Sequence, residues 1–364
     1  NEKKISILGS TGSIGLTSLK IVEKKKHLFS INLLSANKNY KLIIKQIERY
    51  KPKYYFINDE KVYVKVIKRF KRKKTKIINS LNNIVKIKSD ITIIAIPGIA
   101  GLEPTLIMTK LSKKILLANK ESIICGWNLI EKISKQKKTK IIPIDSEHFS
   151  IMKLIYGHNI NEIKKIYLTA SGGPFLNFKI NELKKIKPKD ALRHPKWKMG
   201  KKITIDSSTL MNKILELAEA QKLFNFPEKK LDILIHPNSL VHAIIKLTNG
   251  LTKFIYHDTS MTIPLANAIF DDKLNIENFY KQDKSKNHNF EDLIFRKVDK
   301  KIFPMIKLKD RINEHPSTPI IVNAANEILV DQFLKRKIPF LSIYKIILSI
   351  LKDRNYKKYA IRKP

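Results

Sequence analysis

The sequence has few cysteines and no long apolar runs, and both shortages exclude whole classes of protein. Cys125 is the single cysteine among 364 residues, so no internal disulfide can form and no cysteine cage can hold a metal. The longest apolar candidate, residues 91–102, is interrupted by Pro97, Gly98 and Gly101, whereas a membrane-spanning helix needs about 18 apolar residues in a row. The sequence begins with a strand-like run rather than the apolar core of a secretion signal. We therefore expect no membrane partner and a cytoplasmic protein.

Acidic residues are also scarce. There are 32 of them against 72 lysines and arginines, which gives a net charge of +40. Such a charge indicates either a nucleic-acid or anionic surface partner or a composition biased toward Lys, Ile and Asn. The lysines recur on nearly every predicted surface segment, without interleaved aromatics, as in residues 24–26, 71–74, 135–140 and 184–189. We favour the bias, expect no nucleic-acid partner, and expect the positive field to attract an anionic substrate.

The chain length predicts two to three domains at about 150 residues each. Strand-like and helix-like segments alternate in the first 150 residues, which predicts a parallel sheet with helices on its faces. The predicted strands are 4–8, 31–35, 54–57, 91–96, 114–117 and 140–144, and predicted helices include 16–25, 40–50 and 102–111. The fold class is therefore α/β, with an N-terminal parallel sheet.

The pattern of strand-like and helix-like segments changes after residue 150. Longer strand-like runs flank one clear helix over 208–224, which predicts an α+β domain. These strand-like runs are 163–169, 231–235, 241–247 and 252–256. The boundaries we predict are 1–149 for the first domain, 150–270 for the second, 271–303 for a polar linker and 304–364 for a small helical domain.

The opening segment Gly9-Ser-Thr-Gly12-Ser-Ile-Gly15 joins the first predicted strand to the first helix. Glycines allow a tight turn, and free N–H groups at a helix start bind a pyrophosphate. The spacing is GxxGxxG rather than GxGxxG, so a plain glycine turn is the alternative. Its place on the first strand–helix unit favours a Rossmann-like dinucleotide site.

The end of the second strand indicates which dinucleotide. NAD-binding folds place an acidic residue there for the ribose 2′-hydroxyl. Here the strand is followed by Asn37-Lys38-Asn39, which has no carboxylate. Lys38 would attract the 2′-phosphate of NADP(H), so NADPH is the predicted cofactor.

Two segments carry carboxylates with metal-binding potential. Asp145 and Glu147 follow a predicted strand, and in an extended chain they would share a face, which suits a hard divalent cation. An exposed polar loop is the alternative. In residues 203–216 we expect a strand running into a helix capped by Ser207 or Ser208, with Asn212, Lys213 and Glu216 near one face. This arrangement predicts a phosphate site and a third carboxylate, or else a capped surface helix with a Lys–Glu pair.

Two further stretches fit no simple structural role. Residues 169–175 form a glycine turn after a strand and could present Ser171 to an anion. Residues 194–200 place His194, Trp197 and Met199 on an irregular segment, which suggests a lid that closes over substrate. A buried turn is the alternative in each case.

Together these motifs resemble the 1-deoxy-D-xylulose 5-phosphate reductoisomerase family. The matching stretches, in the family's order, are 9–15, 117–122, 145–148, 170–175, 194–200, 202–213, 236–242, 261–264 and 323–327. The resemblance implies a homodimeric, NADP-dependent oxidoreductase that uses NADPH and Mg²⁺, Mn²⁺ or Co²⁺. It implies a sugar phosphate substrate, 1-deoxy-D-xylulose 5-phosphate, isomerised and reduced to 2-C-methyl-D-erythritol 4-phosphate for isoprenoid synthesis.

The resemblance also assigns roles to residues. It implies metal ligation by Asp145, Glu147 and Glu216, which with Lys120 form the catalytic set. It implies substrate contacts from Lys120, Ser146, Ser171, His194, Trp197, Ser207, Asn212 and Lys213, with His194 and Trp197 on the lid. It implies NADPH contacts from Thr11, Gly12, Ser13, Ile14, Lys38, Asn39, Asn119, Glu121, Gly200 and Met261. In this assignment, residues 1–149 bind NADPH and 150–270 form the catalytic and dimerisation domain.

The sequence departs from the family at three places. Ile214 stands where the family has Gly, Leu176 where it often has Arg, and we expect the last helix of the C-terminal bundle to be absent. We expect activity, because all proposed metal and phosphate ligands are present, with reduced stability.

Two other hypotheses are weaker. An NADP-dependent semialdehyde dehydrogenase would use a cysteine nucleophile, but Cys125 has no obvious His partner nearby and such an enzyme does not need the three carboxylates. A catalytically decayed homologue acting as a basic binding protein would be favoured by loss of a carboxylate or of Lys213, and neither is lost.

Overall fold

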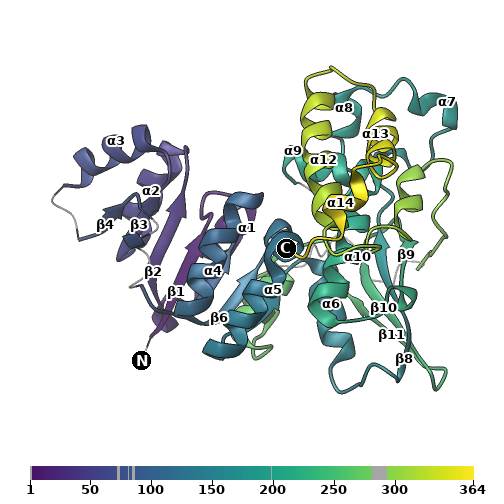
Figure 1. The fold of residues 1–364 in the computed structure, drawn as a ribbon. Coiled ribbons are helices and arrows are strands. Elements are labelled where there is room, and N and C mark those ends of the chain that lie inside the picture. The colour runs from purple at the N-terminus through teal and green to yellow at the C-terminus, as the bar shows by residue number, and fades with distance from the viewer. Residues whose placement is uncertain (1, 72–73, 81, 84–86, 198, 281–292) are drawn as a thin grey trace. The chain divides into compact units, whose positions relative to one another are not determined.

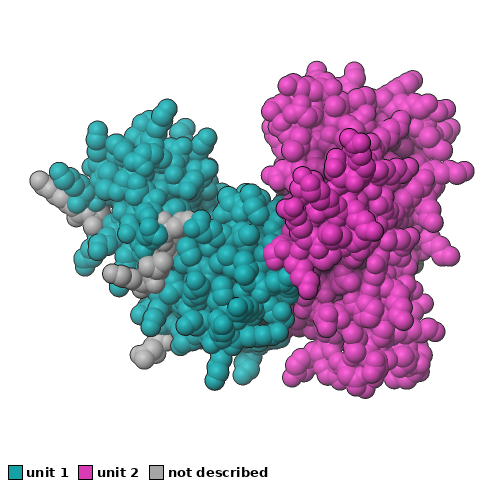
Figure 2. All heavy atoms as spheres, viewed as in Figure 1, with its two compact units in different colours: residues 1–149, 260–285 teal, residues 150–259, 286–364 magenta. Residues whose placement is uncertain are grey.

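The computed structural model describes residues 2–71, 74–80, 82–83, 87–197, 199–280 and 293–364. The chain divides into two compact units: unit 1 comprises residues 1–149 and 260–285, and unit 2 comprises residues 150–259 and 286–364 (Figure 2). Each unit is thus built from two separate stretches of chain. The sequence-based division into three domains and a linker stays a prediction, and residues 281–292 of that linker lie outside the described residues.

Unit 1 is a seven-stranded parallel sheet in the order β4-β3-β2-β1-β5-β6-β7 (Figure 1). Its strands are β1 Lys3–Leu8, β2 Phe29–Ala36, β3 Tyr54–Ile57, β4 Lys76–Ile78, β5 Ser89–Ile94, β6 Ser112–Leu117 and β7 Lys140–Pro143. The central strands are nearly continuous buried runs, as expected where helices cover both faces of a parallel sheet. The predicted parallel α/β sheet is therefore present, and it also contains the short strand β4, which the sequence analysis missed.

The helices of unit 1 follow their strands. They are α1 Ser13–Lys24, η1 Lys26–Leu28, α2 Tyr40–Tyr50, α3 Glu60–Phe70, η3 Ile99–Gly101, α4 Leu102–Leu111, α5 Lys120–Lys137, α11 Thr262–Phe270 and η6 Ile276–Asn278. Helix α4 packs against α5, and α1 packs against α11, which returns from the later part of the chain. The unit boundary falls inside α6 (Ser146–Ile155), so that helix belongs to both units.

Unit 2 contains a mixed four-stranded sheet in the order β11-β10-β8-β9. Its strands are β8 Ile163–Ala170, β9 Leu231–Ile235, β10 Val241–Leu247 and β11 Thr252–Tyr256. Its helices are η4 Gly173–Phe175, α7 Ile180–Leu183, α8 Pro188–Ala191, α9 Lys201–Thr209, α10 Met211–Phe224, η5 Glu228–Lys230, η7 Pro304–Leu308, α12 Thr318–Leu334, α13 Ser342–Ile350 and α14 Tyr356–Ala360. The predicted α+β part and the helical C-terminal part are both present.

The core of unit 2 is helical as well as sheet-like. Helix α10 is buried over nearly its whole length, so the alternative of a capped surface helix is wrong. Helix α12 packs against α9 and α13. None of the helices in the described ranges has the length and apolarity that a bilayer crossing requires.

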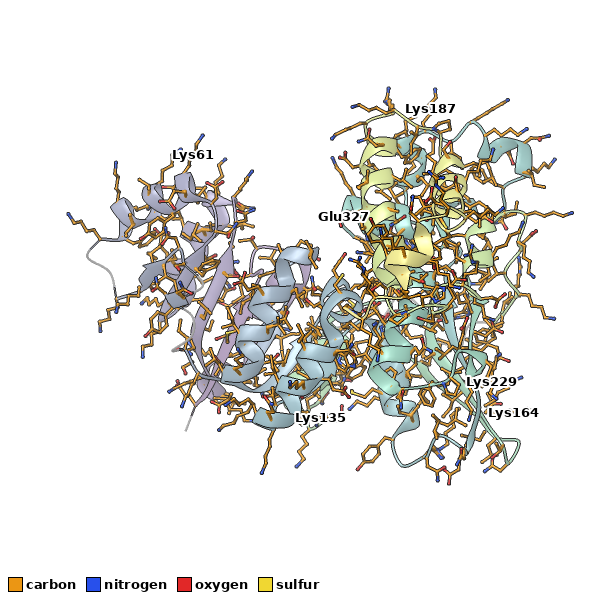
Figure 3. All side chains as sticks on the ribbon, viewed as in Figure 1. Lys61, Lys135, Lys164, Lys187, Lys229 and Glu327 are labelled. Atoms are coloured by element: carbon orange, nitrogen blue, oxygen red, sulfur yellow. The ribbon has the colours of Figure 1, made fainter. Side chains whose placement is uncertain are left out.

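Exposed lysines lie on both units. The labelled Lys61, Lys135, Lys164, Lys187 and Lys229 all point away from the ribbon (Figure 3), and all five are exposed. They come from five different elements or loops. A compositional bias would give this pattern, and that interpretation stays a prediction.

Candidate active site

The three glycines of the opening turn differ in how much room each has for a side chain. Gly9 has φ +86°, and a Cβ there would lie 2.4 Å from the carbonyl oxygen of Ala95 on the neighbouring strand connection. A Cβ on Gly15 would lie 2.4 Å from the carbonyl oxygen of Gly9, so α1 could not approach the turn. A Cβ on Gly12 would meet the Gly9 oxygen at an ordinary 3.5 Å. The fold therefore requires Gly9 and Gly15, whereas Gly12 leaves open space above the turn.

The start of α1 is suited to an anion. Gly12 is the N-cap residue in extended conformation, no side chain among the described residues caps this helix, and its first turn contains no acidic residue. Gly12 and Ser13 are exposed. The turn lies between β1 and its neighbour β5, where the strand order reverses, which is the position at which open α/β sheets bind ligands. A pyrophosphate fits this open turn, whose N–H groups would donate to it.

The end of β2 leads into the second part of the predicted dinucleotide site. Lys38 and Asn39 are exposed, and the Asn39 side chain accepts a hydrogen bond from Leu42 N at 3.2 Å at the start of α2. The 37–39 segment carries no carboxylate. Its surface is compatible with a 2′-phosphate beside the Lys38 ammonium.

Asn119 has a structural function that the sequence did not reveal. Its side chain is 1% exposed; it donates to Ile96 O at 2.6 Å and to Gly98 O at 2.9 Å, and it accepts from Ser122 N at 2.5 Å. It thereby caps α5 and fixes the loop that follows β5. Lys120 and Glu121 occupy the first turn of α5, and Met261 immediately precedes α11.

Asp145 and Glu147 lie at a helix start, so the prediction of an extended strand end is wrong. Strand β7 ends at Pro143, and Asp145 Oδ1 accepts from Glu147 N at 3.1 Å just before α6. This hydrogen bond satisfies an N–H group that the helix itself cannot pair, which explains why the chain turns here. Glu147 and Ser146 occupy the first turn, with Ser146 Oγ donating to Glu147 Oε2 at 2.5 Å. The two carboxylates are partly buried.

The segment 203–209 is helical, so the prediction of a strand that runs into a helix capped by Ser207 or Ser208 is also wrong. Helix α9 ends at Thr209, and α10 begins at Met211 after Leu210, which has φ 69° and is 1% exposed. A left-handed Leu costs roughly 1–2 kcal/mol, and burial of its side chain offsets that cost. Ile203-Thr-Ile favours a strand by local propensity, but most of α9 is buried among other helices, and this packing decides its conformation.

The sharp turn at Leu210 leads into a cluster of polar side chains at the start of α10. Lys213 Nζ donates to Glu216 Oε2 at 2.7 Å, and the Asn212 amide donates to Glu216 Oε1. Glu216 is 0% exposed and Lys213 7%. The structure thus brings together the three residues that the sequence predicted to share a face.

A second polar cluster of unit 2 centres on His194. Its Nδ1 accepts from the backbone N–H groups of Lys196 and Trp197 at 3.2 and 2.9 Å, so the ring proton is on Nε2. Nε2 lies 3.2 Å from Ser171 Oγ and 3.1 Å from Ser207 Oγ. Burial, and secondarily the nearby Lys213 ammonium, lower the pKa of His194 to about 4. His194 is therefore neutral, and both serine hydroxyls lie within reach of its single Nε2–H donor.

Ser171 follows β8 at a glycine turn. Its Oγ accepts from Gly173 N at 3.0 Å, and Gly172 and Gly173 have φ of +82° and +60°. The Ser171 oxygen therefore accepts a hydrogen bond from the turn, while its hydroxyl proton stays available for an anion. Ser171, Ser207 and Lys213 are the donor types that a phosphate group requires.

Trp197 packs on a pair of histidines to which the sequence analysis gave no role. Its ring meets His242 edge to face at 6.2 Å between centroids, and His242 stacks on His257 at 3.7 Å. His242 Nε2 donates to His257 O at 3.0 Å. His242 belongs to a stretch matching the family, and that stretch was the signal available in sequence. The stacking partner His257 could not be found because nothing local links the two residues.

Asp206 is a second residue that the sequence analysis missed as a structural contact. It is 1% exposed, receives a hydrogen bond from Asn326 of α12 at 2.7 Å, and pairs with Lys202 at 2.7 Å. This buried network fixes α9, on which Ser207 lies, to α12. Gly200 caps the start of the same helix.

The relatives of this chain agree with one another. A family model of 1-deoxy-D-xylulose 5-phosphate reductoisomerase matches residues 5–126, and two models of C-terminal domains of that enzyme match residues 141–224 and 258–362. The 1-deoxy-D-xylulose 5-phosphate reductoisomerase of Pelagibacter ubique is 45% identical over 371 residues, which cover 100% of this chain and 94% of that protein. The chain belongs to the 1-deoxy-D-xylulose 5-phosphate reductoisomerase family.

Solved reductoisomerase structures share the fold. The Zymomonas mobilis enzyme in complex with NADPH superposes with a TM-score of 0.89 at 31% identity, covering 100% of this chain and 94% of that one. A reductoisomerase bound to NADPH, fosmidomycin and magnesium gives 0.89 at 31% identity over 98% of this chain and 90% of that one. The family and fold class predicted from the sequence are confirmed. The roles of the individual site residues stay predictions.

Proposed function

We propose that this chain catalyses the NADPH- and divalent-metal-dependent isomerisation and reduction of 1-deoxy-D-xylulose 5-phosphate (DXP) to 2-C-methyl-D-erythritol 4-phosphate. The observation that carries the function is the family relationship, which extends over the whole chain. The chain is an NADP-dependent oxidoreductase, and its cofactors are NADPH and a divalent cation, as the sequence predicted.

The proposed NADPH site is the glycine turn with the exposed end of β2. The N–H groups at the start of α1, which no side chain of the described residues caps, would receive the pyrophosphate, and Lys38 would receive the 2′-phosphate. Thr11, Gly12, Ser13, Ile14 and Asn39 belong to the same edge of the sheet. We also assign Asn119, Glu121, Gly200 and Met261 to this site; Asn119 would act by fixing its loop.

The proposed cation ligands are Asp145, Glu147 and Glu216. Three carboxylates without cysteine or histidine suit Mg²⁺ or Mn²⁺, and their number and type are those of a metal site. Bound there, the cation supplies Lewis acidity to substrate oxygens, and NADPH supplies the hydride. Lys120 and Ser146 would contact the hydroxylated end of the substrate.

The proposed phosphate pocket consists of Ser171, Ser207, Asn212 and Lys213, with His194 behind the two serines. Because His194 is neutral and its proton is on Nε2, it donates to a serine hydroxyl, which can then donate its own proton to phosphate. Lys213 supplies the positive charge. Trp197, held by His242, would cover this pocket and exclude water.

We further propose a homodimer in the cytoplasm, on the strength of the family resemblance. Light scattering of the purified protein at two concentrations measures the dimer directly. A monomer at both concentrations would contradict it.

The test of the function is NADPH oxidation with DXP, followed by absorbance and by identification of the product. We expect turnover that depends on both DXP and Mn²⁺, is lost with a chelator and is recovered on adding metal. An active preparation that ignores the chelator would contradict the proposed metal dependence. A chain that binds NADPH but never turns over would instead support the decayed-homologue alternative.

A further inference from the structure

We propose that Gln46 is a positioning residue for NADPH, because it holds the glycine turn and the start of α2 in one arrangement. This inference rests on the proposed function, since it takes the turn and Lys38 as the NADPH site. Gln46 belongs to neither, and no substrate or cofactor role is otherwise assigned to it.

Gln46 makes its hydrogen bonds to the turn in both directions. It lies on α2 with 3% of its surface exposed. Its Nε2 donates to Ser10 O at 2.9 Å, and its Oε1 accepts from Ser10 Oγ at 2.6 Å. The amide therefore pairs with both the main chain and the side chain of one residue, in the middle of the turn.

Ser10 in turn fixes the end of β2. Its backbone N donates to Ser35 O at 2.8 Å, and Gly9 N donates to Ser35 Oγ at 2.9 Å. Ser35 is three residues before Lys38. The Gln46–Ser10–Ser35 connections thus join the predicted pyrophosphate turn to the segment predicted to hold the 2′-phosphate.

Tyr55 of β3 completes the network. Its hydroxyl donates to Gln46 Oε1 at 2.7 Å, and burial raises the pKa of Tyr55 well above its ordinary range. The phenol therefore keeps its proton and acts as a donor. The remaining acceptor capacity of Gln46 Oε1 is thereby used inside the protein.

Packing alone does not require this polar group. The buried face of α2 already contains Ile43, Ile44 and Ile47, which fix the helix to the sheet. An apolar residue at 46 would fill the same space but leave the buried Ser10 carbonyl without its partner. That loss would loosen the turn relative to α2 and to the Lys38 segment that precedes it, and the proposed NADPH site consists of the turn and that segment.

The experiment measures NADPH binding by fluorescence titration, without metal or substrate, in the wild type and in Gln46→Met. We expect the variant to bind NADPH about tenfold more weakly, a difference of about 1.4 kcal/mol. NADH, which has no 2′-phosphate, should lose less affinity. In the complete assay the KM for NADPH should rise, while kcat and the KM for DXP stay unchanged.

Thr139→Val is the matched control. Thr139 is also a buried residue of unit 1, and its hydroxyl donates to Thr109 O and Ser112 O at 2.7 and 2.9 Å. It lies just before β7, at the amino-terminal end of that strand, whereas the glycine turn lies at the carboxyl-terminal end of the parallel strand β1. We expect Thr139→Val to lower the melting temperature about as much as Gln46→Met does, but to leave the NADPH affinity unchanged. Should Gln46→Met not fold, Tyr55→Phe, which removes one donor, is expected to weaken NADPH binding about threefold, roughly 0.7 kcal/mol.

If the wild type binds NADPH, two results would overturn this inference without affecting the proposed function. One is that Gln46→Met binds NADPH as tightly as the wild type. The other is that Thr139→Val loses as much NADPH affinity as Gln46→Met. In the Tyr55→Phe experiment, unchanged NADPH affinity has the same meaning. A wild type that binds no NADPH would overturn the proposed function, and this inference with it.

Discussion

Lys213 and Glu216 form a buried ion pair one turn apart on α10, with 2.7 Å between Nζ and Oε2. Neither side chain is more than 8% exposed. A buried carboxylate needs a positive partner. In this pair we assign the lysine to the substrate phosphate and the carboxylate to the metal. The pair therefore links the two ligands of the proposed active site.

Replacing Lys213 tests how strongly the buried Glu216 carboxylate depends on its positive partner. In Lys213→Met the buried Glu216 carboxylate loses the positive charge beside it but keeps the hydrogen bond from the Asn212 amide, and we expect a loss of about 3 kcal/mol of unfolding free energy. Mn²⁺ should restore part of that loss, because a bound cation replaces the missing charge. Urea denaturation with and without Mn²⁺ measures both effects.

The control for Lys213→Met is Lys202→Met, which breaks the ion pair of the same unit between the partly exposed Lys202 and the buried Asp206. It should destabilise the protein without any extra recovery in Mn²⁺. An equal response of the two variants to Mn²⁺ would argue against Glu216 as a metal ligand.

Substitutions of the glycines in the opening turn should separate effects on stability from effects on NADPH affinity. Gly9→Ala places a Cβ 2.4 Å from a carbonyl oxygen at φ +86°, so we expect a loss of more than about 2 kcal/mol in unfolding free energy. Gly12→Ala meets only an ordinary contact, so its stability should stay within about 0.5 kcal/mol of the wild type. Its NADPH affinity should nonetheless fall about tenfold or more, since the methyl group occupies the open turn. Denaturation and fluorescence titration test this, and full NADPH affinity in Gly12→Ala would place the cofactor elsewhere.

His194 predicts how stability depends on pH. Its pKa is about 4 in the folded chain and near 6.5 when unfolded, so between these values the unfolded chain binds more protons. Stability should therefore fall as the pH is lowered from about 6.5 toward 4. Urea midpoints at pH 7.5 and 5.0 should differ less in His194→Asn than in the wild type. The same difference in both proteins would show that His194 is not the group responsible.

The C-terminal helix is held by a hydrogen-bond network that should matter for stability alone. The Tyr356 hydroxyl lies 2.5 Å from Glu314 Oε1, which Arg311 also binds, and burial raises the pKa of Tyr356 to about 12. Tyr356→Phe should cost about 1.5 kcal/mol of unfolding free energy without changing any kinetic constant. Tyr359→Phe, at a half-exposed position three residues later, is its control and should cost less than about 0.5 kcal/mol. A change in the KM for NADPH or DXP in Tyr356→Phe would contradict a purely structural role.

Local pattern predicted much of this fold. Helices 40–50 and 102–111 and strands 231–235, 241–247 and 252–256 begin and end where the pattern places them. The helix over 40–50, for example, has a buried apolar face of Ile43, Ile44 and Ile47 and ends at Tyr50, two residues before Pro52. The glycine turn was readable from its spacing and its place after the first strand, although one of its steric demands, the close approach of Gly9 to Ala95, is long-range.

Predictions failed where tertiary packing decides the structure. Residues 203–205 have strand propensity but form a buried helix, and Asp145 caps a helix where an extended end was expected. The contacts that fix the site are long-range: Asp206 and Asn326 are 120 residues apart, and Gln46 meets Ser10 across 36. No periodicity or motif encodes such pairs, so the site's residue types could be predicted and its supporting network could not.

Substrate-dependent NADPH oxidation by the wild type, Glu216→Gln and Glu314→Gln tests the central claim most directly. Glu314 is a partly buried acid of unit 2, remote in sequence from the proposed site and paired with Arg311, so it controls for loss of a carboxylate. With DXP and Mn²⁺ we expect the wild type and Glu314→Gln to turn over. Glu216→Gln should be slower by about a thousandfold, since a catalytic metal contributes several kcal/mol, while its NADPH binding stays intact. Wild-type turnover in Glu216→Gln would contradict the metal assignment on which the proposed mechanism depends.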